Sequence, residues 1–264
     1  MRTRNVLIAL IGAAVVTGAA ACGTSSAPPT ASRSPSAATT LASTSTAATP
    51  SPAQPAPAAD RQSACADLGG TVDANQICHA HTAGPGYEVT FTFPVGYPDQ
   101  QALTTYLTKR REDFAGFAAE TPPRDYPYEL DARADAYRSG TLTSGTRSLV
   151  FEQYSESGGA HPVTSYEAFN YDLGKGVPIT FDTLFKPGTQ PLEVLDPIVS
   201  REFEKYSDDY GPVRDNTLEA KVYQDFAITE DAVIFFIGQG MWLPEVAGPQ
   251  QVSVSRDEIA SILA

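Results

Sequence analysis

The sequence predicts an α+β fold for residues 61–264, in which helices pack on an antiparallel sheet. Strand-like segments, in which apolar and polar residues alternate, come in runs separated by Gly-containing turns. Segments with helical periodicity are few, and they do not alternate one by one with the strands. A doubly wound α/β fold requires that alternation, so this order of segments favours α+β.

The first half of this region is predicted to contain a strand, a helix and then three long strands. Asp99 is a suitable N-cap for the helix, and Thr121, which precedes two prolines, ends it. Two glycines separate the second long strand from the third, and a Gly-Lys-Gly turn follows the third. The predicted segments are a strand at 87–93, a helix at 103–117 and strands at 128–136, 149–154 and 166–171.

The second half is predicted to contain a helix, a strand pair, a short strand and a terminal helix. Pro191 is a suitable first helical residue, and apolar residues follow it at spacings of three and four. Ser255 and Glu258 form a capping-box pattern, which predicts a C-terminal helix. The predicted segments are a helix at 191–206, strands at 226–228, 233–237 and 252–254, and a helix at 255–264.

Residues 1–21 are predicted to be a signal peptide, because two arginines precede an apolar segment at 6–16. That segment is too short to span a bilayer, which takes about 20 residues. Three alanines before Cys22 resemble a bacterial lipobox, although Ala19 stands where most lipoboxes have Leu. We therefore expect lipidation of Cys22. The alternative is ordinary signal-peptide cleavage, which leaves the Cys22 thiol free.

Residues 22–60 are predicted to be a lipidated, disordered tether. Positions 24–59 are almost entirely Ser, Thr, Ala and Pro, so they carry too little apolar surface to fold. Ser and Thr beside Pro are typical of O-glycosylated stalks, and an unmodified spacer is the alternative. We expect the lipid anchor to hold the protein on the cell membrane, outside the cytoplasm and facing the cell wall.

The folded region is strongly acidic. Residues 61–264 hold 15 of the 18 basic residues and 30 of the 31 acidic residues, so their net charge is −15. This charge argues against a nucleic-acid partner and favours a basic protein or other basic ligand. The alternative is that the acidity only keeps an exported protein soluble. Two cysteines of this region, Cys65 and Cys78, are expected to form a disulfide in an oxidising compartment.

Motifs for catalysis are scarce. The chain has no Gly-x-Ser-x-Gly sequence and no phosphate-binding glycine loop, so we expect no cofactor. His161, in a Gly-rich turn between two strands, is the best candidate for a catalytic base or a binding residue. Ser155 or Ser157 is the candidate nucleophile and Asp172 the orienting acid. The interpretation that we favour is that His161 forms hydrogen bonds with the loop backbone and only shapes the turn.

Two further features have both a structural and a functional interpretation. His79 and His81 lie one residue apart and could face the same side of a strand, but no third ligand is evident, so we expect no metal site. Trp242, the only tryptophan, is either part of an exposed binding loop or part of the core, and the core interpretation is favoured.

Several short sequences resemble the mycobacterial major secreted immunogenic protein family, whose members share a domain of unknown function with the lysozyme-sensing anti-sigma factor RsiV. The resemblance extends from about Cys65 to Ala264 and is carried in order by Tyr97–Gln100, Pro127–Leu130, Gly158–Pro162, Ala168–Asn170, Pro178–Leu184 and Phe226–Thr229. Unlike the secreted antigen, this chain has Cys22 and a long tether, so it looks like a lipid-anchored member.

The resemblance implies a small N-terminal subdomain, here residues 61–140, and a C-terminal RsiV-like domain, here residues 141–264. RsiV-type domains bind a basic protein, which agrees with the acidic charge. We therefore expect a non-catalytic cell-surface binding module for a host or cell-wall protein or glycan. Some members of the family are described as cell-wall esterases, so the alternative is a carboxylesterase that acts on short acyl esters.

Overall fold

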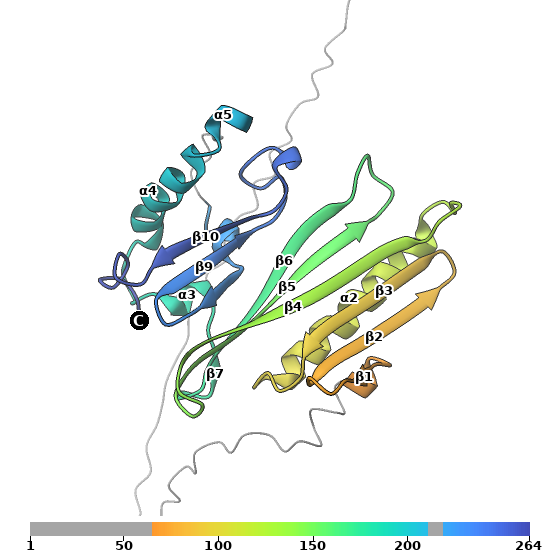
Figure 1. The fold of residues 1–264 in the computed structure, drawn as a ribbon, viewed down its shortest axis with the longest axis horizontal. Helices are drawn as coiled ribbons and strands as arrows, with labels where there is room; N and C mark the ends of the chain where they lie inside the picture. Colours follow the sequence, from red (N-terminus) through yellow and green to blue (C-terminus); the bar gives the residue numbers. More distant parts are fainter. Residues whose placement is uncertain (1–64, 211–218) are drawn as a thin grey trace, which may run out of the picture. The chain divides into compact units, whose positions relative to one another are not determined.

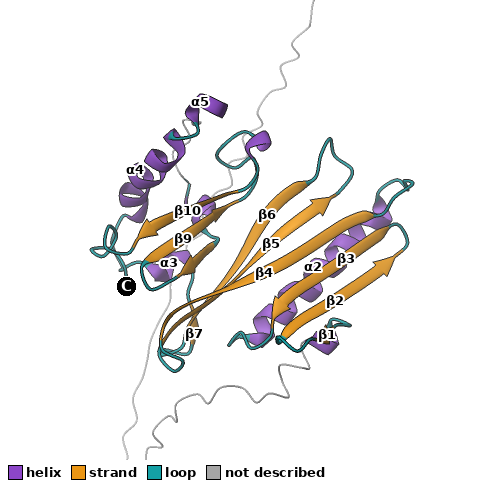
Figure 2. Ribbon diagram, in the orientation of Figure 1, coloured by secondary structure: helices purple, strands orange, loops and turns teal. Residues whose placement is uncertain are grey.

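The computed structural model describes residues 65–210 and 219–264 (Figure 1). These residues form a seven-stranded sheet in the order β1-β2-β3-β4-β5-β6-β7 and a three-stranded sheet in the order β10-β9-β8. Figure 2 shows the helices and strands that make up these layers. The predicted α+β class is confirmed. The predicted signal peptide (1–21) and the whole tether (22–60), including Cys22, lie outside the described residues.

The described chain begins with a hairpin that a disulfide holds in place. Strand β2 (Ile77–Gly84) pairs with β3 (Tyr87–Pro94) along its whole length, and the short β1 (Thr71–Val72) pairs with β2. Cys65 and Cys78 form the expected disulfide, with their Cα atoms 5.8 Å apart. Both residues are buried, so the disulfide attaches the start of the folded chain to the sheet.

Helix α2 (Gln100–Glu120) confirms the predicted helix and its boundaries. The Asp99 side chain accepts a hydrogen bond from the Ala102 amide at the N-terminus, and Thr121 is the extended C-cap residue. The helix returns the chain to the other end of the sheet, so β3 and β4 (Tyr128–Gly140) are parallel. They are the one parallel pair in the sheets of the described chain, which are otherwise antiparallel as predicted.

Strands β4, β5 (Gly145–Glu156) and β6 (Val163–Asp172) form the three-stranded antiparallel unit that the sequence predicts, and β7 (Val177–Pro178) extends it. The expected domain boundary after residue 140 falls in the turn between β4 and β5. These two strands pair along their full length, so residues on both sides of the boundary belong to one sheet.

One face of this sheet packs against α2, which lies behind β3 and β4 in Figure 1. Alternate residues of each strand point to this face, as the period of a strand requires. The buried side chains of this first core include Val89, Phe91, Phe93, Leu103, Leu107, Phe114, Leu130, Ala132, Leu149 and Phe151.

The second core lies around the three-stranded sheet, which consists of β8 (Phe226–Ile228), β9 (Ala232–Ile237) and β10 (Gln250–Ser255). Helix α4 (Pro191–Glu204) begins at the predicted proline and buries Leu195, Val199 and Phe203 in this core. The short helices of this region are α3 (Phe181–Leu184), α5 (Ser207–Tyr210), η1 (Ala220–Tyr223) and η2 (Glu245–Ala247).

The two sheets meet on the face of the seven-stranded sheet opposite α2. Val150 and Tyr166 of the larger sheet form a small cluster with Ala227 and Phe236 of the smaller one. Two buried side-chain hydrogen bonds cross the contact: the Ile228 amide donates to Ser148 Oγ, and Asn170 Nδ2 donates to the Phe226 carbonyl. The smaller sheet covers part of this face, and polar side chains of β2 to β5 occupy the rest.

The predicted C-terminal helix is wrong: residues after Ser255 form successive turns. Ile259 and Ile262 are buried in the second core, and the Lys186 amide donates to the Ile262 carbonyl. So short a segment gains little from a helical turn, because helix nucleation is costly, and these tertiary contacts decide its conformation. No helix within residues 65–210 and 219–264 is long and apolar enough to cross a membrane.

Candidate functional site

His161 lies in the loop of residues 157–162 between β5 and β6, here called the His161 loop. Its Nε2 atom is 3.0 Å from Glu245 Oε2, and its Nδ1 atom is 3.0 Å from the Pro162 carbonyl oxygen. About half of the His161 side chain is exposed. A histidine that contacts a carboxylate and is open to solvent resembles the base and acid of a hydrolytic triad, although the Glu245 side chain is itself 59% exposed.

Both ring nitrogens of His161 face an oxygen acceptor, so the arrangement favours the doubly protonated imidazolium. The Pro162 carbonyl and then the negative charge of Glu245 raise the pKa of His161 above its ordinary value. In this geometry the ring donates through both nitrogens. It accepts a proton from a substrate or a serine only after one of these contacts opens.

Glu245 is the His161 partner that sequence reasoning missed. It lies 84 residues after His161, at the start of η2, and a Gln239 side chain holds the two loops together. Gln239 Nε2 donates to the Glu245 carbonyl, whereas Gln239 Oε1 accepts from the Thr164 amide at the start of β6. No spacing in the sequence predicts a contact between two loops that only the tertiary fold brings together.

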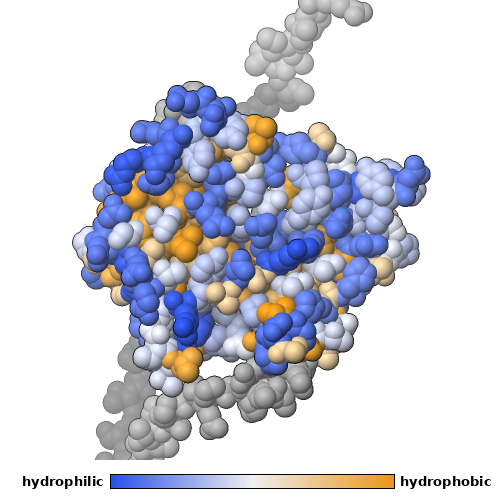
Figure 3. Space-filling model, in the orientation of Figure 1, coloured by the Kyte–Doolittle hydropathy of each residue, from blue (hydrophilic) through white to orange (hydrophobic). Residues whose placement is uncertain are grey.

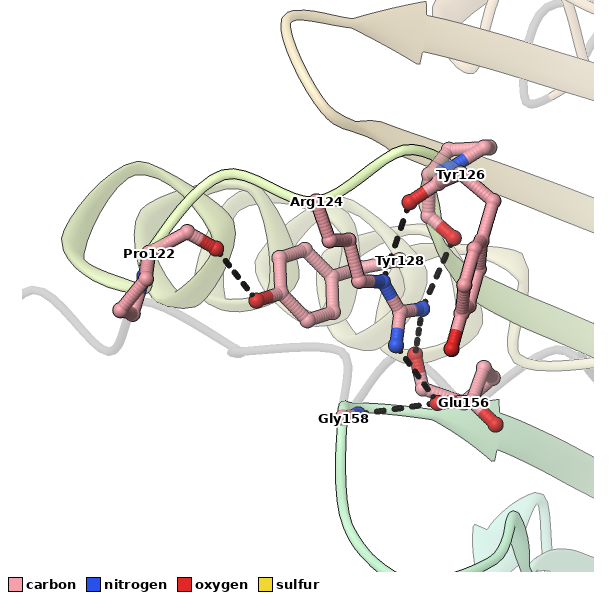
Figure 4. Close-up of polar contacts among 7 residues, drawn as sticks. Pro122, Arg124, Tyr126, Tyr128, Glu156 and Gly158 are labelled. Atoms are coloured by element: carbon pink, nitrogen blue, oxygen red, sulfur yellow. Dashed lines mark hydrogen bonds and ion pairs between the residues drawn. The ribbon is translucent and has the colours of Figure 1, made fainter.

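A cluster around Arg124 fixes the other end of the His161 loop (Figure 4). Arg124 donates to Glu156 Oε1 at 2.8 Å and to the carbonyls of Tyr126 and Pro127, and its guanidinium lies over the rings of Tyr126 and Tyr128. We call this cluster the Arg124 clamp. The arginine side chain is 15% exposed and the glutamate side chain 19%.

The clamp determines how the chain leaves β5. Glu156 Oε1 also accepts a hydrogen bond from the amide of Gly158, which has a φ of +85° that favours glycine. The hydrogen bond from Arg124 lowers the pKa of Glu156, with a further contribution from the Gly158 amide. The ionised carboxylate therefore connects the sheet to the first residues of the His161 loop.

The predicted partners of His161 are only partly brought near it. Ser157 lies in the same loop, whereas Ser155 is still within β5 and opposite Val163. Among the described residues, no hydrogen bond joins His161 to either serine hydroxyl. Asp172 does not orient His161, because it lies at the far end of β6, where it accepts bonds from the amides of a turn.

The His161 loop also offers backbone donors. Within the described chain, no hydrogen bond uses the amides of Gly159, Ala160 or His161, although the Gly158 amide is bonded to Glu156. Successive amides in a Gly-rich turn are the kind of donor that stabilises a developing oxyanion. The His161 loop therefore contains the Ser157 hydroxyl, three amide donors and the His161 imidazole, which contacts the Glu245 carboxylate of another loop.

A groove of about 370 Å³ lies over strands β4 and β5, on the sheet face opposite α2. It is lined by Glu129, Asp131 and Arg133 of β4 and by Glu152 and Tyr154 of β5. Glu129 is the register partner of Glu156 in the Arg124 clamp, so the groove ends next to the start of the His161 loop.

His79 and His81 are exposed on β2, at the edge of the same polar face. His79 Nε2 lies 3.3 Å from Asp73, and His81 Nδ1 lies 3.2 Å from the Thr90 hydroxyl. The described residues contain no group of three or more side chains that could hold a metal ion. These histidines therefore form ordinary surface hydrogen bonds.

Trp242 is a core residue, as the favoured interpretation predicts. Its side chain is buried, and its ring stacks on Phe203 of α4 at a centroid distance of 4.4 Å. The exposed large apolar residues of this loop are Met241 and Val246. The tryptophan therefore presents no surface for binding and instead attaches the loop that carries Glu245 to the second core.

The chain is similar to known mycobacterial proteins over most of its described length. It is 48% identical over 203 residues to Esterase Rv3036c of Mycobacterium tuberculosis, which covers 76% of this chain and 89% of that protein. It is 41% identical over 201 residues to Immunogenic protein MPT64 of the same species, which covers 76% of this chain and 88% of that protein. A family model described as a protein of unknown function (DUF3298) matches residues 182–257.

A solved structure of a DUF3298 family protein from Pseudomonas aeruginosa is also similar. It is 13% identical to this chain, with a TM-score of 0.49, and the alignment covers 73% of this chain and 95% of that protein.

Proposed function

Because this chain belongs to the family that includes Esterase Rv3036c and Immunogenic protein MPT64, we propose that it is an extracytoplasmic carboxylesterase. The observation that carries the proposal is the 48% identity to Rv3036c over 89% of that protein. The sequence prediction put a non-catalytic binding module first and an esterase second. This similarity favours the reverse order, and we assign the chemistry to the His161–Glu245 pair.

In the proposed mechanism, Ser157 is the nucleophile, His161 the general base and Glu245 the acid that orients His161. His161 Nδ1 first leaves the Pro162 carbonyl and releases its proton to solvent, which makes the imidazole neutral. The Ser157 oxygen then attacks the ester carbonyl carbon, and the serine proton passes to Nδ1. The amides of Gly159 and Ala160 stabilise the oxyanion. His161 returns the proton to the departing alcohol, and water then hydrolyses the acyl-serine by the same steps.

The test is hydrolysis of p-nitrophenyl acetate and butyrate by the full protein. We expect Ser157→Ala and His161→Ala to lower kcat/KM by about 100-fold or more, and Glu245→Gln to have a smaller effect. Ser253→Ala, a change of an exposed serine on β10, is the matched control. A covalent acyl group on Ser157, detected by mass spectrometry, would identify the nucleophile directly.

Full activity in the Ser157→Ala protein would eliminate this site assignment, and Ser155→Ala would then test the other predicted serine. Absence of hydrolysis of any short-chain ester by the folded wild-type protein would eliminate the proposed function itself.

The second candidate function is a binding module for a basic cell-wall or host protein. The acidic groove on the open sheet face and the net charge of −15 favour it, because an anionic surface attracts cationic partners. Isothermal titration calorimetry against lysozyme, as a basic protein, tests it. A lack of binding at low ionic strength would remove this candidate.

We also propose that the protein is attached to the cell membrane through lipid on Cys22. The predicted signal peptide and the similarity to immunogenic proteins support an extracytoplasmic location but do not themselves support the lipid anchor. Mass spectrometry of the mature protein should find acyl groups on this cysteine. Cys22→Ala should release the protein into the medium. Unmodified Cys22 in membrane-bound protein would contradict the anchor.

A further inference from the structure

The groove over β4 and β5 has a chemical character of its own. Three of its five lining residues, Glu129, Asp131 and Glu152, are carboxylates, and one, Arg133, is cationic. In Figure 3 the surface over β3, β4 and β5 is coloured mainly as hydrophilic. The groove volume, about 370 Å³, is at the lower end of the range of small-molecule sites, which is roughly 300–1,000 Å³.

Arg133, the cationic residue of the groove, already forms an ion pair within the groove. Arg133 forms an ion pair with Asp131 at 2.6 Å, through both its Nε and its NH2 atoms. Glu129 and Glu152 form no ion pair with any cation of the described chain, and Glu152 accepts only a long hydrogen bond of 3.4 Å from Tyr166. The groove therefore has two carboxylates with free acceptor capacity and a net charge that attracts cations.

An exposed aromatic ring completes this surface. Tyr154 is 37% exposed, although most large apolar and aromatic side chains of the sheet are buried. Partial burial and then the charges of Glu129 and Glu156 raise the pKa of Tyr154, which indicates that the ring lies in a negative field. A tyrosine face next to carboxylates is the arrangement that binds alkylammonium groups.

The groove is also placed where a substrate would reach it. Tyr154 precedes Ser157 by three residues, a strand distance of roughly 10 Å. Glu129, across the ladder from Glu156, lies between the groove and the His161 loop. An ester held at Ser157 could therefore extend a flexible chain of this length along β5 into the groove.

We propose that the groove is a cation subsite, which makes this protein selective for esters that carry an ammonium group some distance from the ester bond. The selectivity for cationic esters rests on the proposed carboxylesterase function. The binding of an ammonium group by the groove does not depend on that function. Charge complementarity between the two free carboxylates and the ammonium group, together with the Tyr154 ring, provides the selectivity.

The experiment compares two p-nitrophenyl esters of equal shape. One carries trimethylammoniohexanoate, and in the other a tert-butyl group replaces the trimethylammonium group. With the full protein at low ionic strength, kcat/KM should be about tenfold higher for the cationic ester, from one exposed cation–π contact and one or two exposed charge pairs. Salt at about 1 M should remove most of the preference, because the Debye length shortens to about 3 Å.

Variants locate the effect. The double change Glu129→Gln and Glu152→Gln should reduce the cationic-to-neutral ratio toward one. The control is Glu193→Gln with Glu204→Gln, which removes the same charge from the exposed side of α4 and should keep the ratio. An equal loss in both double variants would mean that net charge alone is responsible, and would overturn the subsite.

A second measurement separates this inference from the proposed function. Calorimetry with hexyltrimethylammonium, which has no ester, should show binding that weakens in salt and in the groove variant. If the protein hydrolyses the neutral ester but the ratio is one, the subsite is wrong and the esterase stands. If the protein hydrolyses neither ester but binds hexyltrimethylammonium through the groove, the esterase is wrong and the subsite stands. Absence of both preference and binding overturns the subsite.

Discussion

Arg124 shows how much one side chain contributes to the candidate site. Its guanidinium is largely buried, donates to three backbone carbonyls and lies over two tyrosine rings, so its removal leaves several groups without partners. Lysine cannot replace it, because an ammonium group lacks the planar fork that reaches both the carbonyls and Glu156. The position of the His161 loop therefore depends on an arginine that is outside the loop.

The first prediction concerns this residue. Arg124→Ala should lower the free energy of unfolding by about 2–3 kcal/mol, from the lost charged hydrogen bonds and ring contacts. Arg124→Lys should retain only part of the stability that Arg124→Ala loses. Urea denaturation measures the stability, and ester hydrolysis by the folded variants measures the site. Wild-type stability in Arg124→Ala would contradict the clamp.

The second prediction concerns His161. Because its folded pKa is raised, its contact with Glu245 stabilises the protein below the unfolded pKa and is lost as pH rises through the folded pKa. Glu245→Gln should therefore lower the His161 pKa toward its ordinary value, as an NMR titration of the imidazole would show. An unchanged pKa in this variant would mean that Glu245 does not orient the ring.

At the scale of elements, β2 depends on a covalent bond as well as on its ladder. The Cys65–Cys78 disulfide closes a loop that contains β1 and its turn, and it joins the first described residue to the middle of the first core. Strand β1 has only two residues, so residues 65–72 depend mainly on this disulfide, on the buried Leu68 and on the hydrogen bond from Arg111 to the Leu68 carbonyl.

The third prediction follows from this loop. Cys65→Ala with Cys78→Ala should lower the free energy of unfolding by about 3 kcal/mol, according to the chain-entropy estimate for a loop of this size. Faster amide hydrogen exchange should appear first in β1 and the start of β2. Unchanged exchange in these strands would show that the ladder alone holds them.

The edge of β6 that faces away from β5 is another element-scale feature. Asp225, just before β8, accepts a hydrogen bond from the Ala168 amide on this edge. Burial, and then the charge of Glu167, raise the pKa of Asp225 to about 7. The folded protein therefore holds a proton that the unfolded chain has released, so stability falls as pH rises from about 4 to about 7.

The fourth prediction tests this linkage. Asp225→Asn keeps an acceptor for the Ala168 amide, so it should remove most of this decline and stabilise the protein at pH 8 by on the order of 2–4 kcal/mol relative to wild type. At pH 4 the two proteins should be similar. Denaturant titrations at both pH values measure the difference, and a parallel pH dependence in both proteins would contradict it. Burial also raises the pKa of Glu167, so a smaller decline of stability with rising pH should remain in the Asp225→Asn variant.

At the scale of the whole described region, two cores share one interface. The first core lies between the seven-stranded sheet and α2, and the second lies around the three-stranded sheet. The apolar cluster between the sheets is small, so two buried hydrogen bonds also contribute to the contact: Ser148 Oγ accepts one, and Asn170 Nδ2 donates the other. We expect the cores to unfold together, because each sheet satisfies backbone groups of the other.

The fifth prediction tests this coupling. Asn170→Ala leaves the buried Phe226 carbonyl without its side-chain donor and should cost about 2 kcal/mol, whereas exposed Ser253→Ala should change little. Trp242 fluorescence reports on the second core, and far-UV circular dichroism reports on all of the strands. Both transitions should coincide in wild type. Separate midpoints would show that the cores unfold independently.

Most of the fold could be predicted because its elements have local signals. The strand at 87–93, α2 with its Asp99 cap, the three long strands and α4 with its first proline all follow from periodicity and capping within a single segment. The parallel pairing of β3 with β4 has no such signal, since it depends on where α2 returns the chain. The C-terminal capping pattern was misleading because burial of Ile259 and Ile262 outweighed it.

The candidate site was predicted only in part, for the same reason. His161 and Ser157 are neighbours in the sequence, so a Gly-rich turn with a histidine identified them. Glu245 and Arg124 reach that turn from other loops, and Asp172, although close in sequence, lies at the opposite end of β6.

The sequence by itself therefore determined the α+β class, most element boundaries, the disulfide and the acidic charge, because these depend on residues within one segment or on composition. Only the tertiary structure decided which acid faces His161, which arginine holds its loop and where the acidic groove lies. Those features arise when segments far apart in the chain meet, and the free energy of such contacts has no counterpart in local periodicity.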